Sequence, residues 1–266
     1  MITVETFDTI AEASRAMQDR TRYFGGGTLL MRAVNYGDQS IQRMVRTRDA
    51  SLRTIRREGN RILIGAGVTM SQIIASPDAA FLAPVARTIG GPAVRNMATI
   101  GGNLFAPHPY GDFATALLAL DCRARMADGS DMALEDLLSR RDSIRGIVAA
   151  VSVARPMGDD FRFRKVSRVR PKGVSVMSMA AWLSHIGGRL KNVRVAYGAM
   201  DAAPVRVRSV EQTLEGRSLD SQTVEAAARV ATEGLNPQDD ALASAWYRRE
   251  VAPVHLRRLL LGEGRR

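Results

Sequence analysis

The sequence predicts an α+β protein in two parts, divided near residue 158. Three observations predict it. Before that point, short apolar runs ending in glycine alternate with apolar residues at helical spacing. After it, "FRFRKVSRV" (161–169) alternates apolar and charged residues, as an exposed strand does. Three helix-spaced segments then end at Gly216, Gly234 and Gly262, because glycine favours the left-handed residue that closes a helix.

Strands and helices alternate in the first part. Thr9 and Glu12 in "TIAE" match a capping box, which predicts a helix beginning there. The helix expected at 78–89 either tolerates Pro84 or is broken by it. The other predicted elements are a strand entering a glycine loop (22–30), a strand ending in glycines (61–69), helices at 70–76, 78–89 and 111–121, and strands at 122–130 and 147–153.

The second part reads as antiparallel strands followed by helices. Gly187 and Gly188 separate "VSVMSMAAWL" from "LKNVRVAYGAM", which is typical of a hairpin. Helices are expected at 209–216, 221–234 and 243–262. We therefore expect one domain at 1–158, with subdomains of about 1–56 and 57–158, and a second domain at 159–266.

The composition excludes several classes of protein. The formal net charge is +11, but the lysines are Lys165, Lys172 and Lys191, and the arginines are scattered. Without a zinc-finger spacing, an RNP-like motif or a long basic block, we do not expect nucleic-acid binding; a basic face for an acidic protein partner fits better, and an ordinary solvated surface fits better still. No apolar run is long enough to span a membrane, and the N-terminus lacks a secretion-signal pattern, so a cytoplasmic protein is expected.

Two glycine-rich segments predict an anion site. They are "FGGGTLL" (24–30) and "ATIGGNLFAPHPYGD" (98–112). Glycine lets backbone N–H groups approach an anion without a Cβ in the way, and two loops clasp a diphosphate better than one. Thr28, Thr99 and Asn103 would add side-chain donors. Taken alone, either segment is read more readily as an ordinary turn.

Catalytic machinery is sparse in the sequence. There is no P-loop, no G-x-S-x-G and no H-E-x-x-H, and Gly65-x-Gly67 has Met70 where a dinucleotide fingerprint needs a third glycine. His108 lies in the second glycine segment, where a plain loop histidine is the favoured interpretation. Cys122 is the sole cysteine, so the chain cannot hold an iron–sulfur cluster by itself. We assign no catalytic residue and no metal ligand, which suits a protein whose bound redox cofactor does the chemistry.

Four motifs resemble a known family. "GGGTLL", "PAVRNMATIGGNL", "GDFATALLALD" and "WYRREVAPVHLRRLL" occur in the order typical of the FAD-binding medium subunit of the molybdenum hydroxylases, and the resemblance covers nearly the whole chain. This is the flavin component of the xanthine dehydrogenase, aldehyde oxidoreductase and carbon monoxide dehydrogenase family. The resemblance implies the two-subdomain FAD-binding fold of the vanillyl-alcohol oxidase type, followed by a C-terminal domain of antiparallel strands and helices.

The same resemblance implies a function and partners. A large subunit would hold a molybdopterin cofactor and oxidise the substrate, and a small subunit would carry two [2Fe–2S] clusters. Electrons would pass from the clusters to FAD on this chain, and then to NAD⁺, oxygen or a quinone. Heterotrimers of this kind often dimerise.

The resemblance also implies which residues bind FAD. The first diphosphate loop matches Tyr23, Phe24, Gly25, Gly26, Gly27, Thr28, Leu29 and Leu30, and the second matches Thr99, Ile100, Gly101, Gly102 and Asn103. Asp112 matches a carboxylate that binds the flavin nucleotide, and Lys165 a lysine of the cofactor region. Ile89 and Val148 match positions near the isoalloxazine ring. Leu29 departs from the family, which often has Asp, Glu or Ser there.

Two other classes of protein stay open at this point. One is a stand-alone FAD-dependent oxidoreductase of the same fold, which would need its own substrate pocket with an acid or base. The other is a non-enzymatic or nucleic-acid-binding protein, which only the charge favours. The organic substrate cannot be read from this chain, because its pocket would lie in another subunit; the electron acceptor and any further dimerisation are equally open.

Overall fold

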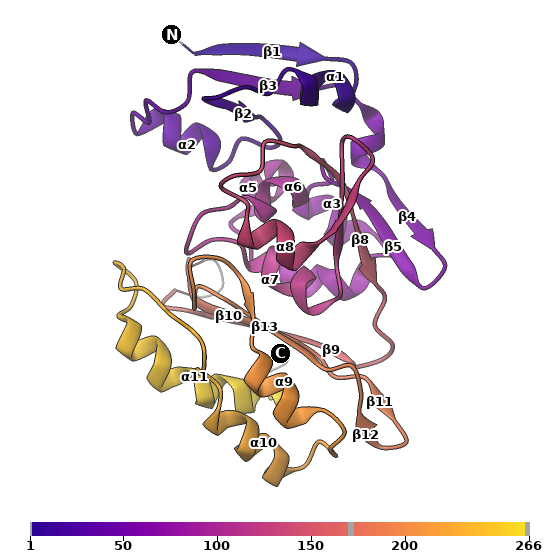
Figure 1. Ribbon diagram of the computed structural model, residues 1–266, viewed down its shortest axis with the longest axis vertical. Helices are drawn as coiled ribbons and strands as arrows, with labels where there is room; N and C mark the ends of the chain where they lie inside the picture. Colours follow the sequence, from indigo (N-terminus) through magenta and orange to yellow (C-terminus); the bar gives the residue numbers. More distant parts are fainter. Residues whose placement is uncertain (1, 170–172, 264–266) are drawn as a thin grey trace. The chain divides into compact units, whose positions relative to one another are not determined.

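Helices and strands are mixed throughout the chain, which confirms the predicted α+β class (Figure 1). The computed structural model describes residues 2–169 and 173–263. Packing of the Cα atoms divides the chain into unit 1, Met1–Ala106 with Cys122–Val153, and unit 2, Pro107–Asp121 with Ala154–Arg266. The domain limits predicted from the sequence stay a prediction; in the structure, 107–121 pack with the C-terminal half of the chain.

Unit 1 begins with a small parallel sheet. Its order is β1 (Thr3–Phe7), β3 (Arg43–Thr47), β2 (Thr21–Tyr23). The predicted capping box at α1 (Ile10–Arg15) is confirmed, because Thr9 Oγ1 accepts from the Glu12 N–H at 3.2 Å and Glu12 accepts from the Thr9 N–H at 3.1 Å. Helix α2 (Leu30–Asn35) follows β2.

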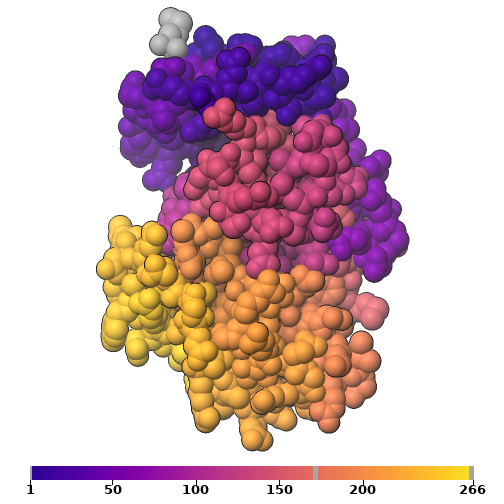
Figure 2. Space-filling view, in the orientation of Figure 1, coloured from indigo at the N-terminus to yellow at the C-terminus, as the bar shows by residue number. Residues whose placement is uncertain are grey.

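A second, five-stranded sheet forms the rest of the strand structure of unit 1. The strand order is β4 (Ile55–Glu58), β5 (Arg61–Gly65), β8 (Val148–Ala154), β6 (Arg123–Met126) and β7 (Asp131–Ala133). A short 3₁₀ turn, η1 (Ala50–Arg53), leads into it. Ile147, just before β8, packs with Ala13 and Val45 of the first sheet layer, so the two sheets share buried contacts. Figure 2 shows the indigo and magenta surfaces of these two halves of unit 1 in contact.

Short helices carry the chain between the strands of unit 1. The segment expected to be one helix at 78–89 splits into η2 (Ala80–Leu82) and α4 (Ala83–Arg87). Pro84 lies in the first turn of α4, where its missing N–H removes no helical hydrogen bond. The remaining helices are α3 (Met70–Ala75), α5 (Pro92–Met97), α6 (Ile100–Leu104) and α8 (Leu134–Ser139).

Unit 2 is an antiparallel sheet covered by helices. Gly187 and Gly188 have φ of 59° and 76° and turn the predicted hairpin between β11 (His185–Ile186) and β12 (Arg189–Leu190). The main sheet has the order β14 (Val205–Arg206), β13 (Arg194–Gly198), β10 (Ser175–Trp182), β9 (Phe161–Ser167).

Helices α7 (Asp112–Ala119), α9 (Arg208–Leu214) and α11 (Ala245–Leu260) pack on the strands of unit 2, and α10 (Ser221–Arg229) packs against α9 and α11. Asp112 opens α7 as predicted. Gly216 and Gly262 have φ of 75° and 71° just beyond α9 and α11. Helix α10 ends at Arg229, five residues before Gly234, so the predicted helix at 221–234 was too long; turns fill the difference.

Candidate functional site

A cavity of about 1130 Å³ lies within unit 1. Ligand sites in proteins usually measure about 300–1,000 Å³, so this volume suits a large ligand. The first sheet layer and the second both contribute to its walls. Its lining comes from 17–26, Thr47, Asp49, Leu52, Arg53, Ala66, Gly67, Thr69, Ser71, Gln72, Asn96, Met97, Thr99, Gly101, Gly102, Phe105 and 141–148.

The first glycine loop presents unused backbone donors. β2 ends at Tyr23, and the Phe24 N–H still donates to the Val45 carbonyl at 2.7 Å. From Gly25 to Leu30, the backbone N–H groups have no acceptor among the residues that the structure describes. Gly25 and Gly26 line the large cavity, so this loop borders it with donors available for an anion.

The two glycine segments are in direct contact. A Cβ on Gly26 would lie 1.7 Å from the Met97 carbonyl oxygen, and one on Gly25 would lie 3.1 Å from Thr99 Oγ1. No side chain larger than hydrogen fits at Gly26 without moving the backbone. The sequence places these segments about seventy residues apart, and the fold joins them beside one cavity.

The second glycine segment is a helical turn rather than a loop. Thr99 caps α6 and accepts from the Gly102 N–H at 3.1 Å. The N–H of Gly101 donates to the Ala66 carbonyl at 2.8 Å, and that of Asn103 to the Thr99 carbonyl at 3.0 Å. The expectation of free backbone donors is therefore wrong for these three residues, because the capped turn already uses them. Thr99, Gly101 and Gly102 nevertheless line the cavity.

A buried hydroxyl in the cavity wall lacks a partner. Thr21 is 3% exposed, and its Oγ1 has no hydrogen-bond partner within residues 2–169 and 173–263. A buried polar atom without a partner costs about 1–3 kcal/mol, so a polar ligand in the cavity would relieve that cost. Next to it, burial and then the charge of Asp49 raise the pKa of Tyr23 to about 12, which keeps the phenol neutral.

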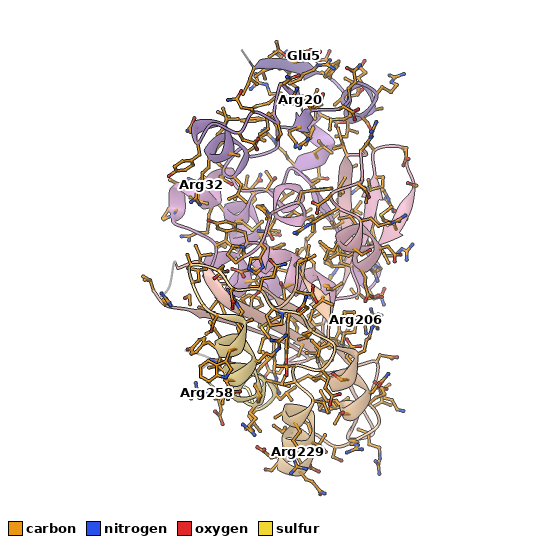
Figure 3. All side chains as sticks on the ribbon, turned by 60° about the vertical axis from the view of Figure 1, so that its left-hand side comes forward. Glu5, Arg20, Arg32, Arg206, Arg229 and Arg258 are labelled. Carbon is orange, nitrogen blue, oxygen red and sulfur yellow. The ribbon has the colours of Figure 1, made fainter. Side chains whose placement is uncertain are left out.

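Arginines surround this cavity, although the sequence showed them only as scattered charges. Arg145 reaches across to Asp19, with Nη2 2.8 Å from Oδ1. Figure 3 labels Arg20, whose Nη2 donates to the Gln39 carbonyl at 2.7 Å. Spacing in sequence gave no signal for this group, because its members come from three separate segments. The lining arginines are Arg20, Arg22, Arg53, Arg141 and Arg145.

The structure distributes the other predicted site residues more widely. Val148 begins β8 and lines the cavity. Ile100 is fully buried and packs in the core, while Leu29 and Leu30 form the start of α2. Ile89 follows α4, where its carbonyl accepts from Arg95 Nη1 at 3.4 Å.

Asp112 and Lys165 lie in unit 2 and are paired there. Lys165 Nζ is 2.9 Å from Asp112 Oδ2, and both side chains are about nine-tenths buried. Ser175 Oγ donates to the other oxygen, Oδ1, at 2.6 Å. These contacts join the start of α7 to β9 and β10.

Comparison with known proteins matches both parts of the chain. Residues 1–153 match the family described as the FAD binding domain in molybdopterin dehydrogenase. Residues 162–262 match the CO dehydrogenase flavoprotein C-terminal domain. The chain belongs to the molybdopterin dehydrogenase flavoproteins. It therefore contains an FAD-binding domain, and the family predicted from its motifs is confirmed.

Several relatives of this flavoprotein bear the names of dehydrogenase subunits. The glyceraldehyde dehydrogenase medium chain of Sulfolobus acidocaldarius is 30% identical over 63% of this chain, a match spanning 62% of the relative's own length. The carbon monoxide dehydrogenase medium chain of Hydrogenophaga pseudoflava is 25% identical, over 79% of this chain and 77% of its own. A putative xanthine dehydrogenase FAD-binding subunit of Escherichia coli is 24% identical, over 90% of this chain and 88% of its own length.

Solved structures share the fold of the flavoprotein. A reconstituted CO dehydrogenase from Oligotropha carboxidovorans superposes with a TM-score of 0.89 at 22% identity, covering 98% of this chain and 96% of that one. Quinoline 2-oxidoreductase from Pseudomonas putida 86 gives a TM-score of 0.88, with the same identity and coverage. Within the described residues, no helix is long and apolar enough to cross a membrane. The same part of the chain holds no cluster of three or more His, Cys, Asp or Glu side chains suited to a metal ion.

Proposed function

We propose that this flavoprotein is the FAD-carrying electron-transfer subunit of a molybdenum-containing hydroxylase or dehydrogenase. In this proposal FAD occupies the cavity of unit 1, with its diphosphate against the first glycine loop. FAD can accept two electrons and release them singly or as a pair. The chain's own residues bind and orient the cofactor, and no residue is assigned a catalytic role.

The observation that carries the proposal is the set of free backbone donors at Gly25–Leu30, of which Gly25 and Gly26 line a cavity of about 1130 Å³. A diphosphate needs several donors, and successive backbone N–H groups supply them without a side chain in the way. The unpaired hydroxyl of Thr21 would gain a polar partner from the same ligand. Arginines of the lining would offset the two negative charges of the diphosphate.

The remaining predicted site residues have proposed roles of different kinds. Thr28 and Thr99 would donate side-chain hydrogen bonds, while Gly101 and Gly102 would shape the cavity wall, because their own N–H groups are used within α6. Leu29 and Leu30 would place the loop by anchoring α2. The family resemblance gives Ile89, Asn103, Asp112, Val148 and Lys165 their proposed places around the flavin nucleotide.

Electrons are proposed to reach the FAD from [2Fe–2S] clusters of a small partner subunit, and to leave to NAD⁺, a quinone or oxygen. A large partner subunit with the molybdopterin cofactor would oxidise the substrate. Two observations support this arrangement. The relatives with assigned activities are medium chains or FAD-binding subunits of dehydrogenases and hydroxylases. Cys122 is the chain's sole cysteine, so the clusters must belong to another chain.

The direct test is reconstitution with FAD. The purified chain should bind one FAD per chain, and acid precipitation should release all the flavin, because no residue is in a recognisable flavin-linking context. Flavin that stays with the precipitated chain would contradict non-covalent binding. A chain that binds no FAD would overturn the proposed function.

A further inference from the structure

One wall of the large cavity is a short connecting segment, residues 141–147, between α8 and β8 (Figure 1). Both of its ends are anchored. The Arg141 Nη1 donates to the Ala106 carbonyl at 2.8 Å, and Ile147 is buried in a cluster with residues of the first sheet layer. Between these anchors most of the residues are exposed. We call residues 141–147 the strap.

A fixed turn of the first sheet layer, residues 18–21, lines the same cavity. Arg20 has a φ of 59°, a left-handed conformation that is uncommon for residues other than glycine. Backbone hydrogen bonds hold the turn in this form: the Thr21 N–H donates to the Gln18 carbonyl at 3.2 Å, and the Gln42 N–H donates to the Arg20 carbonyl at 3.0 Å. Strained residues that the surrounding structure fixes in this way gather at ligand sites.

One ion pair joins the strap to this turn. Arg145 Nη2 lies 2.8 Å from Asp19 Oδ1, and both residues line the cavity. Their side chains are 77% and 78% exposed, so the pair lies on the solvent side of the cavity. An exposed ion pair contributes little to the stability of a whole fold. It matters more for a local opening, because the free energy of moving one exposed segment is itself small.

We propose that the strap closes the FAD cavity, and that the Asp19–Arg145 ion pair holds it closed and slows the release of the bound cofactor. The identity of the ligand rests on the proposed function. Thr21 belongs to the same turn, and its buried hydroxyl has no partner among the residues that the structure describes. A polar ligand that satisfies this hydroxyl lies against the turn that carries Asp19. Such a ligand leaves when the strap opens, and each opening breaks the ion pair.

The test neutralises each partner and measures how fast FAD leaves. Asp19→Asn and Arg145→Gln are made singly and together, and release after dilution is followed by the flavin absorbance that stays with the chain. Both single variants should release FAD about 2- to 5-fold faster, as expected for the loss of an exposed ion pair. The double variant should be no faster than the single ones, because the same interaction is lost in all three.

This design separates the ion pair from a general effect of charge on the diphosphate. Asp19→Asn makes the cavity more positive and Arg145→Gln makes it less positive, so a general charge effect would slow release in the first variant and speed it in the second. The control is the pair of Arg125 and Asp131, which is 3.3 Å long and exposed but does not line the cavity. Arg125→Gln and Asp131→Asn should release FAD at the wild-type rate.

Hydrogen exchange of the strap gives a second readout, which needs no FAD. In the chain without cofactor, the amides of 142–146 should exchange faster in Asp19→Asn and in Arg145→Gln than in the wild type. Wild-type release rates in both variants, opposite changes in the two, or unchanged exchange would each overturn the inference. A wild-type chain that binds no FAD, with faster exchange in both variants, would overturn the proposed function and still support the ion pair as the contact that holds the strap closed.

Discussion

At the scale of single residues, the three glycines of the first loop serve different physical needs. Gly26 lies against the Met97 carbonyl and has no room for a Cβ. Gly27 has a φ of 72°, a left-handed conformation that side chains rarely adopt. Gly25 is limited only by Thr99 Oγ1, at 3.1 Å. The order of sensitivity to substitution should follow these contacts.

Replacing Gly26 by alanine should separate the two glycine segments. The added Cβ meets a backbone carbonyl at 1.7 Å, and backbone cannot rotate away as a side chain can. We expect a loss of about 1–3 kcal/mol in the free energy of unfolding and at least a 10-fold weaker dissociation constant for FAD. Gly91→Ala is the matched control, since a Cβ there meets nothing within 4 Å and its φ is negative. Equal FAD affinity in the two variants would show that the contact is unimportant.

Removing the Asp112 carboxylate should destabilise unit 2. Asp112→Ala leaves Lys165 as a buried cation without its 2.9 Å partner, and breaking such a pair costs about 3–5 kcal/mol. Ser175→Ala removes only one hydrogen bond to the same carboxylate and should cost about 1–3 kcal/mol. Denaturant unfolding of both variants, followed with their flavin content, measures this. If Asp112→Ala costs no more than Ser175→Ala, the ion pair is not a source of stability.

At the scale of elements, one carboxylate anchors the start of α11. Arg248 is fully buried, and its Nη2 donates to Asp240 at 2.7 Å while its Nε donates to the Val176 carbonyl of β10 at 2.8 Å. His108 Nε2 lies 3.0 Å from the same Asp240 oxygen. One aspartate therefore links the segment before α7, the loop before α11 and, through Arg248, the interior strand β10 of the sheet.

The stability of this link should depend on pH in the acid range. Burial opposes ionisation of Asp240, but backbone N–H groups of Ala243 and Leu242, with His108 and Arg248, outweigh it and hold the pKa at about 2, below the ordinary 3.8. The stabilisation is complete above about pH 4 and is lost as the pH falls towards 2. When urea unfolding is measured between pH 4 and 2, the free energy of unfolding should fall more steeply with pH for the wild type than for Asp240→Asn. If the free energy of unfolding depends on pH in the same way in both proteins, Asp240 is not the group that titrates.

At the scale of the whole molecule, the proposed function needs a cavity for FAD and no catalytic residue of this chain. Among the described residues there is no metal-binding cluster. Of its three histidines, His108 is held by Asp240. An electron carrier needs little more than a bound flavin and a docking surface. In the proposed function, the substrate chemistry belongs to a partner subunit.

The isolated chain loaded with FAD should therefore be inactive towards the substrates of the complex. We expect at most slow NADH–dye activity and no hydroxylation of purines, aldehydes or aromatic heterocycles, because the proposed function places molybdenum and iron in partner subunits. Turnover assays with and without the partner subunits check this. Rapid substrate oxidation by the chain alone, with no metal present, would favour the stand-alone flavoenzyme instead.

Local patterns in the sequence determined much of the secondary structure and the family. The capping box at Thr9 and Glu12 and the glycine pair at 187–188 act through hydrogen bonds and backbone angles of neighbouring residues, so short sequences suffice to predict them. Motifs such as "VRNMATIGGN" identified the flavoprotein family for the same reason: they are contiguous in the chain.

Tertiary structure alone decided what the glycine segments and the charges do. The glycines of the 99–103 segment are as typical of a loop as those of the first segment. Hydrogen bonds to the Ala66 and Val68 carbonyls nevertheless fix it as a capped helical turn, so its N–H groups are used. The free backbone donors are therefore those of Gly25–Leu30. The arginines of the cavity and the unpaired Thr21 hydroxyl come from segments distant in sequence. Their meaning depends on contacts across the fold, and no local pattern of residues records such contacts.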